Sequence, residues 1–255
     1  MDSKKLIAKL WKLFPSKIAK EYCDHVGLMT GKLKPEIHKI VLALDMDWEI
    51  FDEVLKVKPD LVITHHPFIY GTRKEVFENN PSRKKLALAL DEANIPVYSF
   101  HTNFDGAKGG MNDALAEALE LKDVYAPEIE PMMRIGYLEK EMNIYDFAKY
   151  AKEKLNVDYG LLIDRGPKTI KKVGVLGGAG GGCIWSAQKE GVDFYISGDA
   201  PHHVRRDIVN ENLNYMDVPH EVESIFVPTM AKYLRNMDNS LEIIQIIHEK
   251  MPKVI

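Results

Sequence analysis

Apolar, β-branched runs alternate with helical patterns along this 255-residue chain, and this alternation restricts the possible folds more than any other feature. The helices expected between the runs begin at Asp47, Ser82 and Asn112, which are typical N-cap residues. Strands that alternate with helices are typical of βαβ units with parallel strands. The first such runs are at 38–46, 60–66 and 95–105.

The same alternation resumes after residues 123–131, a proline-rich and acidic stretch that predicts a linker. We therefore expect an α/β protein of two similar halves with mostly parallel sheets, residues 1–125 and 126–255. The C-terminal helix and strand could pack on the first half. "PDLVITHHP" and "VDFYISGDAPHH" resemble each other, either through an internal duplication or because parallel strands look alike. Sites form beyond the C-terminal ends of parallel strands, so we expect the site in the cleft between the halves.

Composition excludes several classes of protein. Hydrophobic residues make up 45% of the chain and charged residues 28%, as in ordinary globular domains. The net charge of −4 argues against nucleic acid as a partner. No run approaches the roughly 18 apolar residues of a membrane span. Cys23 and Cys183 are far apart, so we expect no disulfide framework, two buried thiols and a cytoplasmic location.

Two adjacent histidines, His65 and His66, end the strand pattern "DLVIT". Successive side chains of a strand point to opposite faces, so both rings enter one cleft only if the strand ends at Thr64. One imidazole could then serve each of two metal ions. Alternatively, one histidine is the polar end of a buried strand.

Two further clusters carry metal-ligand side chains. His101 and Asp105 lie four residues apart just after a strand pattern, although Asp105 could also be a turn residue before a glycine. "PHEVE" contains His220, Glu221 and Glu223, and the first and last of these share a face if the segment is helical. The acids could equally favour the positive end of a helix dipole.

Taken together, the clusters supply four histidines and two carboxylates. Six such donors suit two ions about 3.5–4 Å apart, with water completing each coordination shell. Mixed nitrogen and oxygen ligands favour Zn, Fe, Mn or Co over Mg or Ca. The pattern predicts a two-metal site with these ligands: His65, His66, His101, Asp105, His220 and Glu223.

The glycine-rich "GGAGGGC" at 177–183 fits neither a dinucleotide fingerprint nor a P-loop. Its glycines allow close backbone approach, as in a tight turn. His202 and His203 follow "SGDAP" and are either near the substrate or part of a surface loop.

Several motifs together resemble the NGG-one-interacting factor three-like family, also named dinuclear metal centre hexameric proteins or GTP cyclohydrolase I type II homologues. They include Asp24 before "VGL", "ALDMD", "LVITHHPFIY", "YSFHTNFDGAKGGMNDALAEAL", "RIGYL", "VGVLGGAGGG" and "YISGDAPHH". The resemblance covers nearly the whole chain, in the short form without the inserted domain. It implies a homohexamer built as a trimer of dimers.

The resemblance also implies that His65, His66, His101 and Asp105 are metal ligands, followed by a His and a Glu near the C-terminus. The family pattern Asp-x-x-His-x-x-x-Glu fits Asp217 and His220, but Ser224 stands four residues after His220. A one-residue deletion makes Glu223 the ligand, and Glu221 is the alternative. His25 replaces a common Asn and adds a nitrogen donor with no assigned role.

The sequence thus favours a metal-dependent hydrolase that uses a metal-activated water on a small-molecule phosphoester, amide or purine-like, cyclohydrolase-type substrate. Asp24, Asp199 and His203 are weaker candidates for proton transfer or orientation. The alternative is a metal-binding assembly, chaperone or regulatory protein with structural ions.

Overall fold

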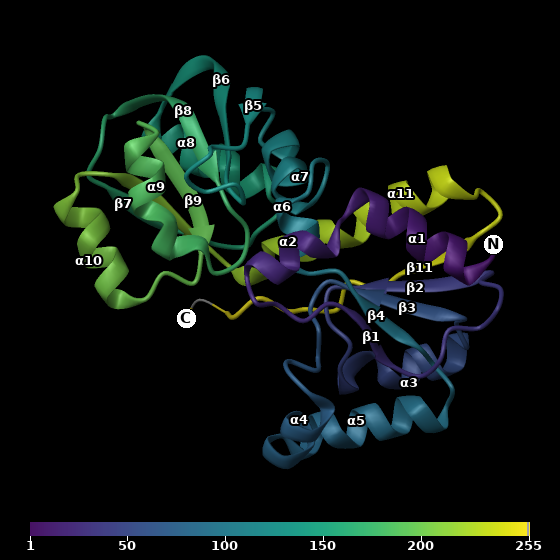
Figure 1. Ribbon diagram of the computed structural model, residues 1–255. Helices are drawn as coiled ribbons and strands as arrows, with labels where there is room; N and C mark the ends of the chain where they lie inside the picture. The colour runs from purple at the N-terminus through teal and green to yellow at the C-terminus, as the bar shows by residue number, and fades with distance from the viewer. Residues whose placement is uncertain (254) are drawn as a thin grey trace. The chain divides into compact units, whose positions relative to one another are not determined.

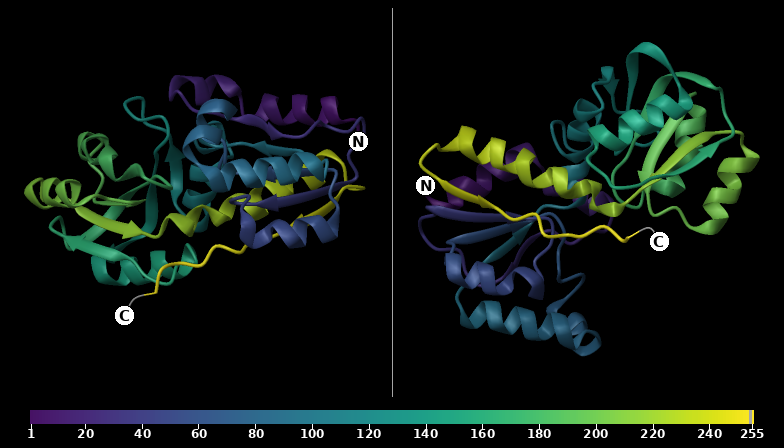
Figure 2. Two further views of the ribbon diagram at one scale, coloured as in Figure 1. Left: turned by 90° about the horizontal axis from the view of Figure 1, so that it is seen from below. Right: turned by 180° about the vertical axis from the view of Figure 1, so that it is seen from behind.

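The computed structural model describes residues 1–253 and 255, which form two compact units (Figures 1 and 2). The first unit comprises Met1–Gly110 and Phe226–Glu249, and the second comprises Met111–Ile225 and Lys250–Ile255. Each unit has its own β-sheet covered by helices. The predicted α/β class with two halves is therefore confirmed. No helix in the described part of the chain is both long and apolar enough to cross a membrane.

The first unit is built on a five-stranded sheet with the strand order β1-β4-β3-β2-β11. Strand β1 is antiparallel to β4, and every other neighbouring pair is parallel. As a result, the chain leaves β2, β3 and β4 at one edge and enters β1 at that same edge. The strands are β1 (Gly27–Thr30), β2 (Lys39–Ala43), β3 (Leu61–Thr64), β4 (Val97–Ser99) and β11 (Glu242–Gln245).

Helices cover both faces of this sheet, with α1 and α11 on one face and α3 and α5 on the other (Figures 1 and 2). Short helices fill the connections at the edge where β3 and β4 end. The helices of the unit are α1 (Ser3–Leu13), α2 (Ser16–Glu21), α3 (Trp48–Val57), α4 (Arg73–Asn79), α5 (Pro81–Glu92), α6 (Thr102–Gly106) and α11 (Phe226–Met237).

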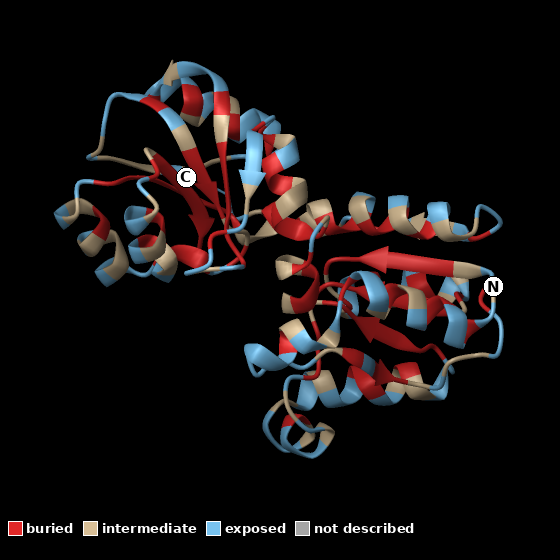
Figure 3. Ribbon diagram, turned by 45° about the horizontal axis from the view of Figure 1, so that its top comes forward, coloured by how far each residue is buried: buried red, intermediate tan, exposed pale blue. Residues whose placement is uncertain are grey.

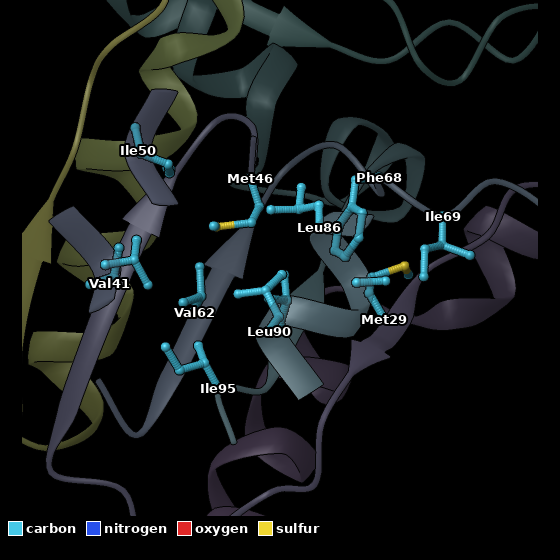
Figure 4. Close-up of a cluster of buried hydrophobic side chains, with 14 of the residues drawn as sticks. Met29, Val41, Met46, Ile50, Val62, Phe68, Ile69, Leu86, Leu90 and Ile95 are labelled. Atoms are coloured by element: carbon cyan, nitrogen blue, oxygen red, sulfur yellow. The ribbon is translucent and has the colours of Figure 1, made fainter. Parts of the chain in front are cut away.

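One hydrophobic core cluster of the first unit lies between the sheet and helices α3 and α5 (Figure 4). Val41 and Val62 project from the strands toward Ile50 of α3 and Leu90 of α5, and all four side chains are buried. Burying each such side chain contributes about 1.5–3 kcal/mol. The predicted cap of α3 is confirmed, because Asp47 accepts hydrogen bonds from two amides of the first turn.

The second unit is built on a six-stranded sheet with the order β5-β6-β8-β9-β10-β7. Its centre, β8-β9-β10, is parallel and buried, and the outer strands pair antiparallel (Figure 3). The three central strands therefore also end at one edge. The strands are β5 (Lys122–Tyr125), β6 (Arg134–Asn143), β7 (Leu161–Asp164), β8 (Thr169–Val175), β9 (Phe194–Gly198) and β10 (Asn214–Val218).

Four α-helices and two 3₁₀-helices complete the described part of the second unit. Its core includes Ile135, Tyr195 and Tyr215 of the sheet, packed with Ile184 of α9 and Ile208 of α10. The helices are α7 (Met111–Ala118), α8 (Ile144–Lys154), η1 (Gly180–Cys183), α9 (Ile184–Lys189), α10 (His202–Asn210) and η2 (His220–Ile225).

Three local predictions were wrong. Helix α5 starts one residue before Ser82, and its cap is Asn80, which accepts a hydrogen bond from the amide of Arg83. Asn112 lies inside α7, and its side chain accepts a hydrogen bond from the Gly177 amide instead of capping the helix. The expected linker at 123–131 begins inside strand β5, which pairs with β6.

The two cysteines also differ from the expectation of two buried thiols. Cys23 is exposed and Cys183 is only partly buried, next to Glu130. Both are free thiols, as expected for a chain without a disulfide framework.

Candidate metal centre

Polar side chains follow each of the three parallel strands at one edge of the first sheet. Asp45 comes after β2, His65 and His66 after β3, and His101 after β4. Strand β3 ends at Thr64, which is the condition under which both rings could enter one cleft, so both adjacent histidines lie beyond the pleat of the strand. Because parallel strands end at a common edge, residues far apart in the sequence meet there.

His65, His66 and His101 form a compact group. One ring nitrogen of each lies within 4.8 Å of those of the other two. The His65 ring centroid is 4.9 Å from that of His66 and 5.0 Å from that of His101. His65 is fully buried, and the other two are partly buried. Three clustered imidazoles at this burial make a candidate metal-binding group.

A hydrogen bond fixes the ring orientation of the adjacent histidines. His65 donates from Nδ1 to the carbonyl oxygen of Phe100, 2.9 Å away. His66 donates from Nδ1 to Oδ2 of Asp45, also at 2.9 Å. With Nδ1 used in this way, Nε2 is the atom that can ligate an ion, an arrangement found around metal-bound histidines.

His101 is held in the same way by Asp24, which precedes β1. Its Nδ1 lies 2.8 Å from Asp24 Oδ2, and the same oxygen accepts from the hydroxyl of Thr102 at 2.7 Å. Burial alone raises the pKa of Asp24, but the bonds from His101 and Thr102 outweigh it and lower the pKa to about 2. Asp24 is therefore a carboxylate that orients His101, which makes proton transfer by this residue a poor assignment.

Asp105 adds a carboxylate to the same group. It lies in the short helix α6, and its Oδ1 is 3.5 Å from Nε2 of His65. Two ligands of a tetrahedral ion with bonds of about 2.1 Å lie about 3.4 Å apart. The separation of these two atoms therefore fits a shared ion.

The second unit has a corresponding arrangement at the edge where β8, β9 and β10 end. Asp199 follows β9, and His220 follows β10 at the start of η2. His220 donates from Nδ1 to Asp199 Oδ2 at 2.6 Å, and its Nε2 is 3.0 Å from Glu223 Oε2. Residues i and i+3 are eclipsed in a 3₁₀-helix, which brings His220 and Glu223 together despite the shortened spacing.

The glycines after β8 make room for Glu223. A Cβ atom on Gly178 would lie 2.4 Å from Oε1 of Glu223, and one on Gly177 would lie 3.5 Å from the same oxygen. Gly178 also has a φ of +62°, a conformation that favours glycine. The glycines of "GGAGGGC" were expected to allow another group to approach the backbone closely, and in the structure that group is the buried Glu223 side chain. Glu221 has no such contact with His220 among the described residues.

The remaining sequence candidates lie outside these groups. His25 is exposed, and His202 and His203 are exposed in the first turn of α10 rather than in a loop. Asp217 is the penultimate residue of β10 and forms an ion pair with Arg205, with 2.6 Å between Oδ2 and the guanidinium. Asp199 positions His220 and therefore has the same role as Asp24.

Sequence reasoning assigned no role to Asp45 or to the carbonyl of Phe100. Asp45 stands in "ALDMD", a motif noted only as a strand end, and its position beyond a parallel strand next to "HH" was the available signal. A backbone carbonyl carries no signal of its own in a sequence.

The donors present fit a transition-metal ion. Each of the four histidines has Nδ1 hydrogen-bonded to an oxygen, so Nε2 is the ring nitrogen available to an ion. Carboxylates lie 3.5 Å and 3.0 Å from two of these Nε2 atoms. Imidazole with carboxylate suits Zn, Fe, Mn and Co.

Comparisons with known proteins agree with the fold. The chain is 30% identical over 241 residues to a GTP cyclohydrolase 1 type 2 homolog of Clostridium perfringens, covering 91% of this chain and 92% of the relative. A homolog of the same name from Lactococcus lactis is 31% identical, covering 91% of each chain. The crystal structure of a Bacillus cereus protein related to NIF3 superposes with a TM-score of 0.87 at 22% identity, covering 100% of this chain and 99% of the other.

A family model described as Duf34/NIF3 (NGG1p interacting factor 3) matches residues 1–252, which is nearly the entire chain. The chain belongs to the Duf34/NIF3 family.

Proposed function

We propose that this protein is a metal-dependent hydrolase that binds two divalent transition-metal ions. The observation that carries the proposal is the common geometry of four histidines, each with Nδ1 hydrogen-bonded to an oxygen and Nε2 left as the ligating atom. Burial of a histidine does not by itself require that Nδ1 be hydrogen-bonded and Nε2 be available to an ion, yet all four histidines share this arrangement. The proposed ligands are His65, His66, His101, Asp105, His220 and Glu223.

Each residue has a defined part in this proposal. Asp24, Asp45 and Asp199 hold the rings of His101, His66 and His220 in place. A carboxylate hydrogen-bonded to a ligating imidazole also makes the imidazole more basic. Bound ions at this site would lower the pKa of a coordinated water toward about 7, which makes hydroxide available near neutral pH. The proposed substrate is a phosphoester, an amide or a purine-like ring, and the relatives' name, GTP cyclohydrolase 1 type 2 homolog, supports the last of these.

The test is metal-dependent turnover of 4-nitrophenyl phosphate and of a panel of amides and purine nucleotides. His101→Ala and Asp105→Ala should abolish turnover while the thermal melt stays that of a folded protein. The matched control is His38→Ala, because His38 is exposed and lies at the opposite end of β2. Turnover that persists after chelation contradicts the proposal.

A null result in every substrate class, with two bound ions and no exchangeable water on them, supports the alternative of a non-enzymatic metal-binding or regulatory protein. Magnetic resonance of Mn²⁺- or Co²⁺-loaded protein detects bound water directly. Open coordination positions are expected for a catalytic site.

The hexamer and the cytoplasmic location stay predictions from the family resemblance and the cysteine usage. Light scattering coupled to gel filtration should give the mass of six 29.0 kDa chains. A mass of one or two chains contradicts the trimer of dimers.

A further inference from the structure

The first unit contains a cavity of about 360 Å³ whose lining includes none of the proposed metal ligands. It is lined by α1, α2, the start of β1 and the segment after β3. Its walls are largely apolar, from Trp11, Val26, Leu28, Met29 and Ile69. Small-molecule pockets have volumes of about 300–1,000 Å³, so this cavity suits a small ligand with an apolar or aromatic body.

The cavity adjoins the three-histidine group. Asp24 lines the cavity, and the same side chain lies 2.8 Å from Nδ1 of His101. Ile69 and Gly71, which also line it, lie three and five residues after His66 in the chain. A molecule in the cavity is therefore separated from the His101 imidazole by a single side chain.

Three charged side chains of the lining, Lys20, Asp24 and Arg73, decide which ligand charge the cavity favours. Arg73 lines the cavity but lies 2.6 Å from the carboxylate of Asp91, which offsets its charge. The Asp24 carboxylate is already bonded to His101 and Thr102. Lys20 lines the cavity and has no ion-pair partner among residues 1–253 and 255. Asp24 keeps its negative charge, because its hydrogen-bond donors are neutral, so the lining is close to neutral overall and the Lys20 ammonium is the cation that, among the described residues, is left to pair with an anionic ligand.

We propose that this cavity binds the non-reacting part of the substrate, an apolar or aromatic group that carries one negatively charged substituent, with Lys20 as its counter-charge. The substrate role rests on the proposed hydrolase function, whereas binding in the cavity does not depend on bound ions. The site thereby favours small anionic, ring-containing compounds over neutral amides.

The test uses metal-free full-length protein and phenyl phosphate as the probe. The chain has three tryptophans, so Trp48→Phe with Trp185→Phe leaves Trp11, in the cavity wall, as the only fluorescent indole. Both replaced tryptophans are about half exposed, with relative exposures of 45% and 48%. Phenyl phosphate should change the Trp11 fluorescence saturably, and inorganic phosphate or phenol alone should bind at least tenfold more weakly.

A charge reversal then tests the lysine, with a matched control on the same helix. Lys20→Glu should weaken phenyl phosphate binding about five- to tenfold, because a partly solvated attraction becomes a repulsion. Lys17→Glu makes the same change in net charge on α2 but lies outside the cavity, and it should weaken binding less than twofold. Raising the salt concentration should reduce the difference between the two variants.

Absence of saturable binding, equal binding of phenol and phenyl phosphate, or equal effects of the two reversals would each overturn the proposal. Because no metal is present, these results are independent of hydrolysis. If the metal-loaded protein binds phenyl phosphate but does not turn it over, only the hydrolase proposal is contradicted. If turnover does not depend on Lys20, only the assignment of the cavity is contradicted.

Discussion

The Nδ1 atom of His101 lies 2.8 Å from Oδ2 of Asp24, a residue 77 positions earlier in the chain. The contact exists because β1 runs antiparallel to β4, so the start of β1 and the end of β4 share one edge of the sheet. Asp24 thereby fixes the ring that supplies one of three clustered nitrogens that could hold a metal ion.

Replacing Asp24 by Asn should weaken metal binding by about 10–100-fold, because an amide orients the imidazole less well and does not make it more basic. Competition against a fluorescent chelator measures the affinity. The control is Asp52→Asn, an exposed carboxylate on α3, which should leave the affinity unchanged. Equal affinities in all three proteins would show that Asp24 does not support a ligand.

Glu223→Gln should remove one bound ion per chain, whereas Glu221→Gln should keep both. Only Glu223 lies within 3.0 Å of a histidine ligand atom, and its side chain is buried. Elemental analysis after gel filtration gives the stoichiometry. Loss of an ion in the Glu221 variant instead would assign the ligand to Glu221.

Gly178→Ala should lower the affinity for one ion and reduce stability by about 1–3 kcal/mol, because the new Cβ meets Glu223 Oε1 and the positive φ strains alanine. Gly182→Ala is the matched control in the same glycine run, since a Cβ there meets nothing within 4 Å. Chemical denaturation and metal titration of both variants measure the effects. Equal stability and affinity in the two variants contradict the packing argument.

Protonation of Asp60 at low pH should destabilise the first unit. Burial raises its pKa, but the Lys34 ammonium and the amides of His38 and Lys39 outweigh this and lower it from 3.8 to about 2. A lowered folded-state pKa gives stability that is complete above about pH 4 and is lost as the pH falls toward 2.

Asp60→Asn should therefore lower the free energy of unfolding by about 1–2 kcal/mol at pH 7, a figure that allows for solvent screening at Lys34. At pH 2 the substitution should change this free energy very little. Urea denaturation at several pH values measures this difference. If the substitution destabilises the protein equally at every pH, the charge of the Asp60 carboxylate is not the cause.

The two cysteines should differ in reactivity. Burial, followed by the neighbouring Glu130 carboxylate, raises the pKa of Cys183 to about 12, so its thiolate is scarce at pH 8. Cys23 is exposed. A thiol reagent at pH 8 should modify Cys23 first, as peptide mass spectrometry would record. Faster labelling of Cys183 would contradict the burial of its sulfur.

The elements that could be predicted were those with long apolar runs or a clear helix cap in the sequence. Strands β2 and β3 and helix α3 follow from uninterrupted apolar runs and the Asp47 cap. Strand β10, by contrast, was not predicted, because its sequence "NYMDV" carries polar residues that only the buried sheet centre explains. The order of polar and apolar residues within a short segment does not show that the segment is buried by the strands and helices around it.

The candidate site shows the same division. The adjacent histidines of "THH" could enter one cleft only if the strand ended at Thr64, and β3 does end there. The partners of those rings were not predictable, since Asp45 and the Phe100 carbonyl reach them through sheet topology. Exposure of Cys23 was likewise missed, because the turn before β1 gives this residue a φ of +53° outside the core.

Anomalous scattering from crystals of protein purified without chelators or metal-affinity resin tests the central claim most directly. The account predicts two transition-metal ions per chain, bound through Nε2 of His65, His66, His101 and His220 with Asp105 and Glu223 as carboxylate ligands. Ions bound through Nδ1, or histidines that remain metal-free at saturating metal, would contradict it.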